Sequence, residues 1–413
     1  MFLWLYRVAI RFSSVWNVKA RKWVTGRKNI FDRIQSRIAD NPPSKLIWIH
    51  CSSLGEFEQG RPLIERIRRQ GTGHKILLTF FSPSGYEVKK NYPGADYICY
   101  LPIDSGKNAP KFLDLINPDL IIFIKYDYWY YYLHEIKKRK ISCLLISAVF
   151  RKDQPFFKWY GALQRKMLFC FTQIFVQNEE SKKLLETIDI KNCMVAGDTR
   201  FDSVVEIAER FEPIPLIENF INNSKCIIAG STWEQDEKIL QKVFIELKDY
   251  ELKLIIAPHE IHPSHLKDLK ELFPQSVFFS DLPTSDSRLP TPILIVDNIG
   301  MLSRLYKYAW LSYIGGGFTR DGVHNVLEAA VYGKPVVFGK NYKKYKEAID
   351  LIESGGAKTF SGKDELHQVF ITLVTDEDDY RQRCQASKNY VQENKGATER
   401  VLHYIEINRL LTS

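Results

Sequence analysis

The sequence lacks the features that define several large classes of protein. Its seven cysteines are an odd number and form no Cys-x-x-Cys pair, which argues against a disulfide framework and for a reducing compartment. No tandem repeat or low-complexity tract is present. The most apolar stretch, at the N-terminus, is interrupted by Arg7 and Arg11 and falls short of the roughly 20 residues of a spanning helix. Hydrophobic residues still make up 45% of the 413, and this length fits two domains.

The familiar catalytic signatures are also missing. Gly333 and Lys334 are followed by Pro335 rather than Ser or Thr, so they form no phosphate-binding Walker motif. No Ser–His–Asp or Cys–His arrangement stands out. The segment with His259, His262 and His265 reads HEIH rather than HExxH, and Pro263 disrupts the helix that would align metal ligands. We expect no metal and no cofactor.

Net positive charge is nearly absent from the body of the protein, where basic and acidic residues almost balance. The first 33 residues account for seven of the nine net positive charges, through Arg7, Arg11, Lys19, Arg21, Lys22, Arg27, Lys28 and Arg33 against Asp32 alone. Charge confined to one segment argues against nucleic-acid binding. Because Trp4, Trp16 and Trp23 accompany the cations, residues 1–33 are predicted to lie in the interface of an anionic membrane. The alternative is a first helix packed on the protein's own surface.

What remains is a regular alternation of short apolar strands and helices, which predicts an α/β fold with two parallel sheets covered on both faces. The first Rossmann-like domain is predicted over residues 44–205, and the second over residues 225–377. A linker with prolines is expected between them, at residues 206–224, and residues 378–413 are expected as a helix that packs back toward the first domain. Two such domains would hold a ligand in the cleft between them.

The most specific motif runs from Tyr313 to Gly339. A strand leads into three glycines, followed by a helix predicted from Asn325 to Gly333. Glycines admit a ligand where a Cβ would intrude, a helix N-terminus suits a phosphate, and Glu328 could bind a ribose hydroxyl pair. The simpler interpretation is a turn and an ordinary connection between helix and strand. The whole pattern favours a nucleotide-sugar site.

Polar residues also follow strands elsewhere in the chain. Glu56 could act as a general base, although Ser53 and Glu56 also match the S-x-x-E capping box. Ser231 and Thr232 could cap a helix or contact a phosphate, and His259 is placed to contact a nucleotide. In the first domain Lys125, Asp127, Arg151 and Arg200 suit an anionic acceptor, with a solvated surface as the equal alternative.

At these residues the sequence resembles the 3-deoxy-D-manno-octulosonic acid (Kdo) transferases, inverting glycosyltransferases of the two-domain GT-B type. The likeness lies in WIHCSSLGE, DTRFD, AGSTWEQDE, IVDNIGMLSRLY and the glycine motif. The resemblance implies transfer of Kdo from CMP-Kdo to a tetraacyl lipid A precursor at the cytoplasmic face of the bacterial inner membrane. It also implies a reaction without metal, with Glu56 as general base.

Together, the residues and the resemblance give two sets of site residues. The predicted donor contacts are Ser231, Thr232, His259, Gly300, Met301, Gly315, Gly316, Gly317, His324, Asn325 and Glu328. The predicted acceptor contacts are Ser52, Ser53, Gly55, Lys125, Asp127, Arg151 and Arg200. The chain departs from the family at two places. It has Pro-His-Glu-Ile-His where the family often has Pro-Arg-His-Pro, and Lys125-Tyr-Asp127-Tyr-Trp where the family often has Glu-x-Glu-x-Trp.

Two other functions remain open at this stage. Another GT-B enzyme, such as a UDP-sugar transferase or epimerase, would prefer UDP to CMP in competition binding. A non-catalytic protein of the membrane surface would release no CMP from CMP-Kdo. The oligomeric state and the number of Kdo residues transferred cannot be read from the sequence.

Overall fold

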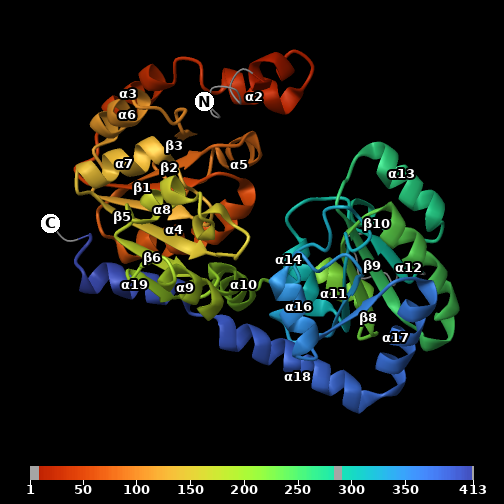
Figure 1. Ribbon diagram of the computed structural model, residues 1–413. Helices are drawn as coiled ribbons and strands as arrows, with labels where there is room; N and C mark the ends of the chain where they lie inside the picture. The colour runs from red at the N-terminus through yellow and green to blue at the C-terminus, as the bar shows by residue number, and fades with distance from the viewer. Residues whose placement is uncertain (1–8, 283–290, 412–413) are drawn as a thin grey trace. The chain divides into compact units, whose positions relative to one another are not determined.

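The computed structural model describes residues 9–282 and 291–411 and divides into two compact units. The first unit contains Met1–Ser203 and Lys395–Ser413, and the second contains Val204–Asn394. Each unit is built on its own seven-stranded parallel sheet (Figure 1). Among the described residues, no helix combines the length and the apolar character needed to cross a membrane.

The first sheet has the strand order β3-β2-β1-β4-β5-β6-β7, and every neighbouring pair is parallel. Its strands are β1 (Leu46–Cys51), β2 (Lys75–Phe80), β3 (Tyr97–Tyr100), β4 (Leu120–Ile124), β5 (Ser142–Ala148), β6 (Gln173–Val176) and β7 (Cys193–Val195). From β1 the chain adds β2 and β3 on one side, and from β4 it adds β5, β6 and β7 on the other side. The order in which strands are added therefore reverses between β1 and β4. Ligands of open α/β sheets bind at the carboxyl edge beside such a reversal.

Helices cover both faces of this sheet. They are α4 (Leu54–Gln70), α5 (Pro83–Lys89), α6 (Asn108–Ile116), α7 (Tyr130–Lys138), α8 (Ala162–Leu168), α9 (Glu179–Glu186) and α19 (Ala397–Ile407). Successive residues of β1 alternate between two cores: Trp48 packs into one, and Ile47 and Ile49 pack into the other. Burial on both sides explains why the strands are apolar runs rather than alternating patterns.

The second sheet has the order β10-β11-β9-β8-β12-β13-β14, again with every neighbouring pair parallel. Its strands are β8 (Cys226–Thr232), β9 (Lys253–Pro258), β10 (Val277–Phe278), β11 (Ile293–Ile295), β12 (Leu311–Ile314), β13 (Val336–Gly339) and β14 (Ala357–Phe360). The helices of the unit include α12 (Glu234–Glu246), α13 (Pro263–Leu272), α14 (Leu302–Leu305), α15 (Leu327–Ala330), α16 (Lys346–Glu353) and α17 (Lys363–Thr375). The two sheets confirm the predicted α/β class and the two Rossmann-like domains of GT-B type.

The segments that join the units differ in detail from the sequence prediction. The predicted linker at 206–224 contains the end of helix α10 (Thr199–Glu209) and all of α11 (Pro215–Ile221). Because α10 continues across residue 203, the units divide inside a helix rather than in a loop. The C-terminal stretch is two helices, α18 (Glu377–Asn394) in the second unit and α19 in the first. Gly396, with φ of 99°, separates them in a left-handed conformation that favours glycine.

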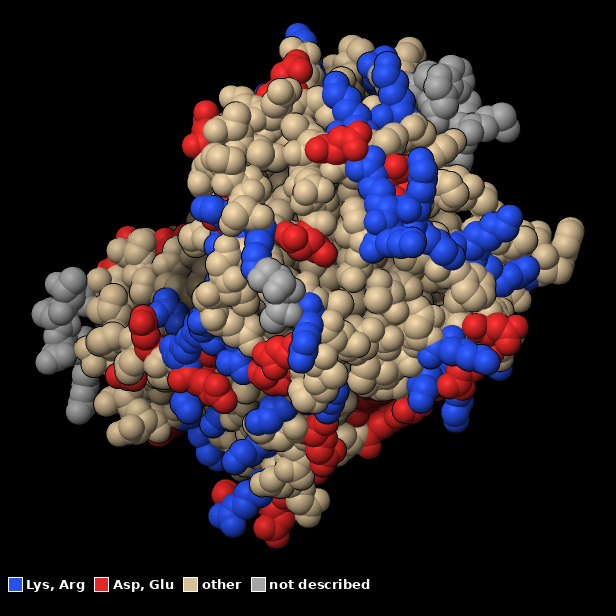
Figure 2. Space-filling model, turned by 90° about the vertical axis from the view of Figure 1, so that its left-hand side faces the viewer, with Lys and Arg blue, Asp and Glu red and all other residues tan. Residues whose placement is uncertain are grey.

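In the described part of the N-terminal segment, residues 9–13 are helical, and α2 (Val18–Thr25) and α3 (Ile30–Asp40) follow. Trp23 is 5% exposed and packs against Phe81 at 5.7 Å, so it belongs to the protein core and not to a membrane-facing surface. Trp16 is 65% exposed, and Trp4 lies outside the described residues. Lysine and arginine side chains gather on the upper part of the face in Figure 2, at the height of α2 and α3 in Figure 1. The exposed basic residues of these helices are Lys19, Arg21, Lys22, Arg33 and Arg37.

Candidate functional site

The predicted base Glu56 lies in the first turn of α4, directly after the carboxyl end of β1. Ser53 is the N-cap of this helix and accepts the N–H of Glu56 at 3.5 Å. The Ser53 hydroxyl also donates to the Glu56 carboxylate at 2.6 Å. Ser53 therefore both caps the helix and holds the carboxylate of Glu56 in place. Glu56 remains partly exposed. Gly55, between them, is exposed.

Several predicted acceptor contacts meet around a tyrosine that the sequence analysis did not select. Burial raises the pKa of Tyr126, and the charges of Arg151, Glu56 and Arg200 act on its hydroxyl, along with Asp198. These groups come from the ends of four strands, β1, β4, β5 and β7. The carboxyl edge of the first sheet therefore brings Glu56, Arg151 and Arg200 within electrostatic range of one side chain, that of Tyr126.

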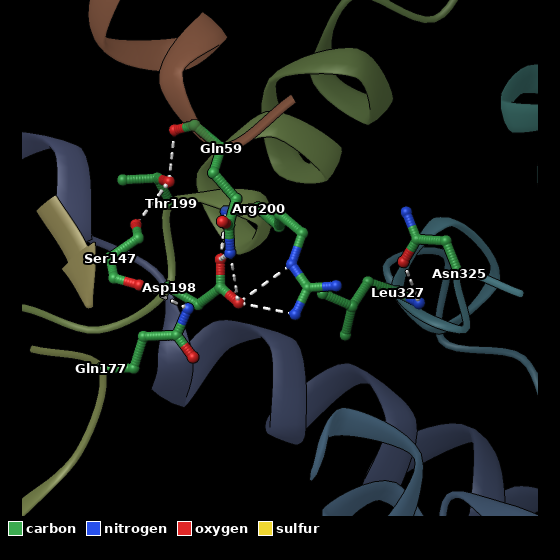
Figure 3. Close-up of polar contacts among 8 residues, drawn as sticks. All are labelled: Gln59, Ser147, Gln177, Asp198, Thr199, Arg200, Asn325 and Leu327. Atoms are coloured by element: carbon green, nitrogen blue, oxygen red, sulfur yellow. Dashed lines mark hydrogen bonds and ion pairs between the residues drawn. The ribbon is translucent and has the colours of Figure 1, made fainter. Parts of the chain in front are cut away.

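Arg200 is held in place by a buried polar network (Figure 3). Its backbone N–H and its guanidinium donate to Asp198 at 2.9, 2.9 and 2.7 Å. Gln59 donates to the same carboxylate at 3.3 and 3.4 Å. Burial opposes ionisation of Asp198, but the charge and hydrogen bonds of Arg200 outweigh it, and the pKa lies below its ordinary value. Arg200 is thus a preorganised cation rather than a mobile surface group.

Thr199 joins this network to the neighbouring strands (Figure 3). Its hydroxyl lies 3.0 Å from that of Ser147 and donates to the backbone carbonyl of Gln59 at 2.5 Å. Gln177 donates to the Ser147 carbonyl at 3.2 Å. Hydrogen bonds therefore link the carboxyl end of β5 to residues that follow β1, β6 and β7, and they fix the base of the site.

Asp127 is buried and lies behind the surface that the acceptor prediction assumed. It is 2% exposed, accepts a hydrogen bond from the Ser52 hydroxyl, and lies 3.7 Å from the fully buried His50. Burial raises the pKa of Asp127 well above its ordinary value, and the charge of Glu56 raises it further. Ser52 and Asp127 therefore support the site from inside, and Glu56 is left as the partly exposed carboxylate.

Lys125 stands at the turn between β4 and this buried aspartate. Its φ of 61° is left-handed, which is uncommon for a side chain of this size. Its ammonium lies 5.2 Å from the centre of the Tyr126 ring and acts electrostatically on Asp198. The lysine thus belongs to the same group of charges as Arg200.

In the second unit, a buried aspartate organises the glycine loop. Asp236 accepts the N–H of Gly316 at 2.9 Å, the hydroxyl of Tyr313 at 2.7 Å and the N–H of Trp233 at 3.0 Å. The last of these bonds caps α12. Ser231 and Thr232 do not cap this helix, because Trp233 is the N-cap and the Thr232 hydroxyl donates to Glu237 at 2.9 Å.

The three glycines are required by close packing of the chain on itself. A Cβ on Gly315 would lie 2.2 Å from the Ser231 carbonyl oxygen, and one on Gly317 would lie 2.4 Å from the backbone nitrogen of Gly339. Gly316 has φ of 86°, and its N–H is already bonded to Asp236. The N–H of Gly315 is used in the sheet. The glycine run therefore lets the carboxyl ends of β8, β12 and β13 approach one another. Because the N–H groups of Gly315 and Gly316 are already bonded within the protein, they are not available to a ligand.

Three flat rings stack beside this loop. His259 lies 4.7 Å from Trp233 and 4.4 Å from His324, measured between ring centres. The Trp233 indole N–H donates to His324 Nε2 at 3.0 Å, so that nitrogen is an acceptor and the proton is on Nδ1. Burial and, to a smaller extent, the charge of His259 lower the pKa of His324 to about 4, and burial also lowers the pKa of His259. The stack is therefore neutral near pH 7.

The remaining donor predictions are placed as follows. Asn325 accepts the N–H of Leu327 at 3.2 Å, as drawn in Figure 3, and donates to Glu328 at 3.0 Å. The helix predicted from Asn325 to Gly333 is a single turn, α15 (Leu327–Ala330), because the chain turns at Val331 and leaves the helix before the glycine. A helix this short supplies little dipole for a phosphate.

Gly300 and Met301 precede α14. Gly300 has φ of 96° with open space around it, and Met301 is buried. Of the other histidines, His265 is paired with Glu237 at 3.1 Å.

Five residues that matter here were absent from the predicted site. Tyr126 stands between Lys125 and Asp127 in a run of aromatic residues that is typical of a core, although it is 40% exposed. Asp198 lies two positions before Arg200, so the motif contained it. Gln59, Trp233 and Asp236 lie inside helical or capping patterns, and nothing in the sequence distinguishes them from surface residues.

Comparison with known proteins now adds to this geometry. Residues 28–203 match the family model described as 3-deoxy-D-manno-octulosonic-acid transferase (Kdo transferase). Over this part of its length the chain is similar to the Kdo transferases. It is 28% identical over 317 residues to the 3-deoxy-D-manno-octulosonic acid transferase of Aquifex aeolicus, covering 75% of this chain and 80% of that one.

A second relative is longer than this chain. The chain is 28% identical over 322 residues to a bifunctional glycosyltransferase/methyltransferase of Fusobacterium nucleatum; the match covers 75% of this chain but spans only 49% of that protein. Among solved structures, a putative UDP-N-acetylglucosamine 2-epimerase from Listeria monocytogenes has a TM-score of 0.61 at 14% identity. The match covers 90% of this chain and 98% of the epimerase chain. At that identity the likeness describes the fold alone.

Proposed function

We propose that the protein is an inverting glycosyltransferase that moves Kdo from CMP-Kdo to a tetraacyl lipid A precursor. The observation that carries the proposal is the position of Glu56. It is a partly exposed carboxylate, oriented by Ser53, whose charge acts on Tyr126 together with those of Arg151 and Arg200, in a chain similar to the Kdo transferases. A carboxylate next to fixed cations suits deprotonation of a hydroxyl on an anionic acceptor.

In the proposed reaction, Glu56 removes the proton of the acceptor hydroxyl as its oxygen attacks the anomeric carbon of Kdo. The bond between that carbon and the CMP phosphate oxygen breaks, and CMP leaves with the electron pair. The configuration at the anomeric carbon is inverted because the attack is a direct displacement. We propose no metal in this step, and turnover unaffected by a chelator is the corresponding expectation.

The donor contacts are proposed to come from the second unit. Its neutral stack of Trp233, His259 and His324 offers flat surfaces and one imidazole N–H donor, which suit the pyrimidine and its sugar. Asn325 and Glu328 bind each other and lie on the segment that follows His324, where a ribose could bind.

The enzyme is proposed to work at the cytoplasmic face of the bacterial inner membrane. Exposed apolar and basic residues alternate before and within α2, among them Phe12, Trp16, Lys19 and Arg21. This combination suits an anionic bilayer, where the lipid acceptor resides.

Mass spectrometry of the product tests the proposal most simply. Purified protein incubated with CMP-Kdo and a tetraacyl lipid A precursor should add one or more Kdo masses, with release of CMP. A UDP-sugar in place of CMP-Kdo should give no product. Addition of a sugar from the UDP donor, or no product from either donor, would contradict the proposal.

A further inference from the structure

A second apolar and basic surface lies far from the N-terminal segment in the sequence. It is formed by residues 151–169, which include α8 and the 3-10 helix η1 (Pro155–Phe157), and we call it the Trp159 segment. Trp159 is 91% exposed, Tyr160 57% and Leu163 52%. Large apolar side chains so fully in water mark an interaction surface when they cluster. The rings of Trp159 and Tyr160 are 5.5 Å apart.

The apolar side chains are held outward by the fold. Phe156, three residues before Trp159, is 5% exposed and packs against Tyr128 at 4.9 Å and Phe150 at 5.7 Å. Arg165 donates to the carbonyls of Phe156 and Lys158 at 3.0 and 2.9 Å, which closes the turn between η1 and α8. The segment is therefore anchored on its inner side.

Gly161 fixes the other side of the same turn. A Cβ there would lie 1.8 Å from the Pro155 carbonyl oxygen, so only glycine fits. Its N–H donates to Lys158 and its carbonyl accepts from Arg165. A tight turn with a glycine-only position keeps Trp159 and Tyr160 at its tip, where folding leaves them in water.

The charge of the segment indicates what covers this surface. It contains five basic residues, Arg151, Lys152, Lys158, Arg165 and Lys166, against Asp153 alone. Lys152 and Lys166 are exposed on either side of the aromatic tip. Basic residues that flank an exposed tryptophan match an anionic bilayer, in which the ring enters the acyl boundary and the cations meet the phosphates.

We propose that the Trp159 segment is a second membrane-contacting element, which inserts Trp159, Tyr160 and Leu163 into an anionic bilayer. The segment begins at Arg151, whose charge acts on the Tyr126 hydroxyl, as does the charge of Glu56. A bilayer contact here would keep the acceptor-side edge of the first unit at the membrane surface. The inference goes beyond the transferase reaction, because it requires only lipid and neither donor nor acceptor.

Quenching of tryptophan emission tests the insertion directly. The full-length protein is mixed with vesicles of phosphatidylglycerol and phosphatidylethanolamine whose acyl chains carry bromine. Wild type should lose part of its emission to the bromines, and Trp159→Phe should lose measurably less. Trp310→Phe is the matched control, since Trp310 is 9% exposed and lies in the second unit. An equal quenched fraction in Trp159→Phe and wild type would overturn the proposal.

A binding measurement gives a second, independent result. The double variant Tyr160→Ser/Leu163→Ser should partition into the same vesicles roughly tenfold or more weakly, because the two lost apolar side chains together remove burial worth at least about a factor of ten. Ile245→Ser, which changes a residue that is 59% exposed in the second unit, should partition like wild type. Unchanged binding of the double variant would contradict the insertion, as would a Trp159-dependent dimer in vesicle-free buffer. Neither assay contains CMP-Kdo, so an inactive transferase would leave both results interpretable.

Discussion

The two units present opposite chemistry at the same edge of similar sheets. In the first unit the edge carries formal charges, with Glu56 among Arg151 and Arg200. In the second unit it carries stacked neutral rings, including Trp233 and His324, beside a loop of glycines. The same parallel sheet therefore supports either a charged or a neutral site, and the residues after the strands decide which.

The difference indicates a division of roles. The proposed proton transfer and recognition of an anionic acceptor require charges at fixed positions, and in the first unit Asp198, which is bonded by Gln59, fixes the guanidinium of Arg200. The proposed recognition of a nucleotide requires flat faces and oriented donors, and burial lowers the pKa of His324 to about 4, which keeps its ring neutral near pH 7. We expect substitutions in the two units to separate catalysis from donor binding.

The largest expected effect is on turnover, in the first unit. Glu56→Gln keeps the size of the side chain and can keep the bond from Ser53, but it removes the basic carboxylate. We expect kcat to fall by about 10²- to 10⁴-fold, the usual contribution of a general base. Initial rates of CMP release measure it. Glu58→Gln, two residues on in the same helix, is the control and should keep most activity.

The second prediction concerns the backbone of the second unit. Gly317→Ala would place a Cβ 2.4 Å from the backbone of Gly339, which cannot move aside without opening the sheet edge. We expect a loss of about 3 kcal/mol or more in the free energy of unfolding of this unit. Urea denaturation followed by circular dichroism measures it.

Gly55→Ala provides the comparison from the first unit. A Cβ there meets only the Ser53 hydroxyl, at 3.9 Å, so alanine should leave stability unchanged or slightly raised. Equal destabilisation by the two substitutions would show that the glycine run is not distinguished by packing.

The third prediction compares two buried aspartates of the first unit. Asp198 has a lowered pKa because Arg200 outweighs its burial, so its stabilising contribution is present above the pKa of the unfolded chain and is lost as pH falls. Asp198→Asn should cost about 3 kcal/mol near pH 7, because Arg200 loses its charged partner.

Asp127 should behave in the opposite way. Burial and Glu56 raise its pKa, so the folded protein holds a proton that the unfolded chain releases, and stability falls as pH rises toward the folded-state pKa. Asp127→Asn mimics the protonated form and keeps an acceptor for Ser52. We expect its stability at pH 8 to equal or exceed that of wild type. Denaturation midpoints at pH 5 and pH 8 decide the comparison, and a large loss in Asp127→Asn would refute it.

The smallest expected effect is on the orientation of one ring. Trp233→Phe retains an aromatic face but removes the N–H that donates to His324. Donor affinity should fall about fivefold, the value of roughly one neutral hydrogen bond, with little change in kcat. KM for CMP-Kdo measures it. Trp310→Phe, which changes a ring stacked on Tyr380 at the start of β12, should leave KM unchanged.

Much of the fold follows from local pattern. The apolar strands and the helices between them are visible because both faces of a parallel sheet are buried. The start of the helix after Ser53 is predicted by the Ser53–Glu56 capping box, and Ser53 is its N-cap in the structure. That Glu56, Arg151 and Arg200 follow strands at one edge was predictable, because carboxyl ends of parallel strands share one edge.

Other features depend on contacts distant in the sequence. The reason for the glycines is the approach of residues 231 and 339, which no local pattern reveals. The roles of Asp236 and Gln59 are set by partners at Gly316 and Asp198. Likewise the burial of Asp127 depends on how β1 and β4 pair, so a polar residue after a strand looked exposed when it is not.

Calorimetric titration with CMP tests the division of roles most directly, using Glu56→Gln and His324→Ala side by side. The account predicts that Glu56→Gln binds CMP as wild type does, although it turns over poorly. His324→Ala should bind CMP at least several-fold more weakly, because it loses an oriented donor and one ring of the stack. Weak CMP binding by Glu56→Gln together with wild-type binding by His324→Ala would contradict the account.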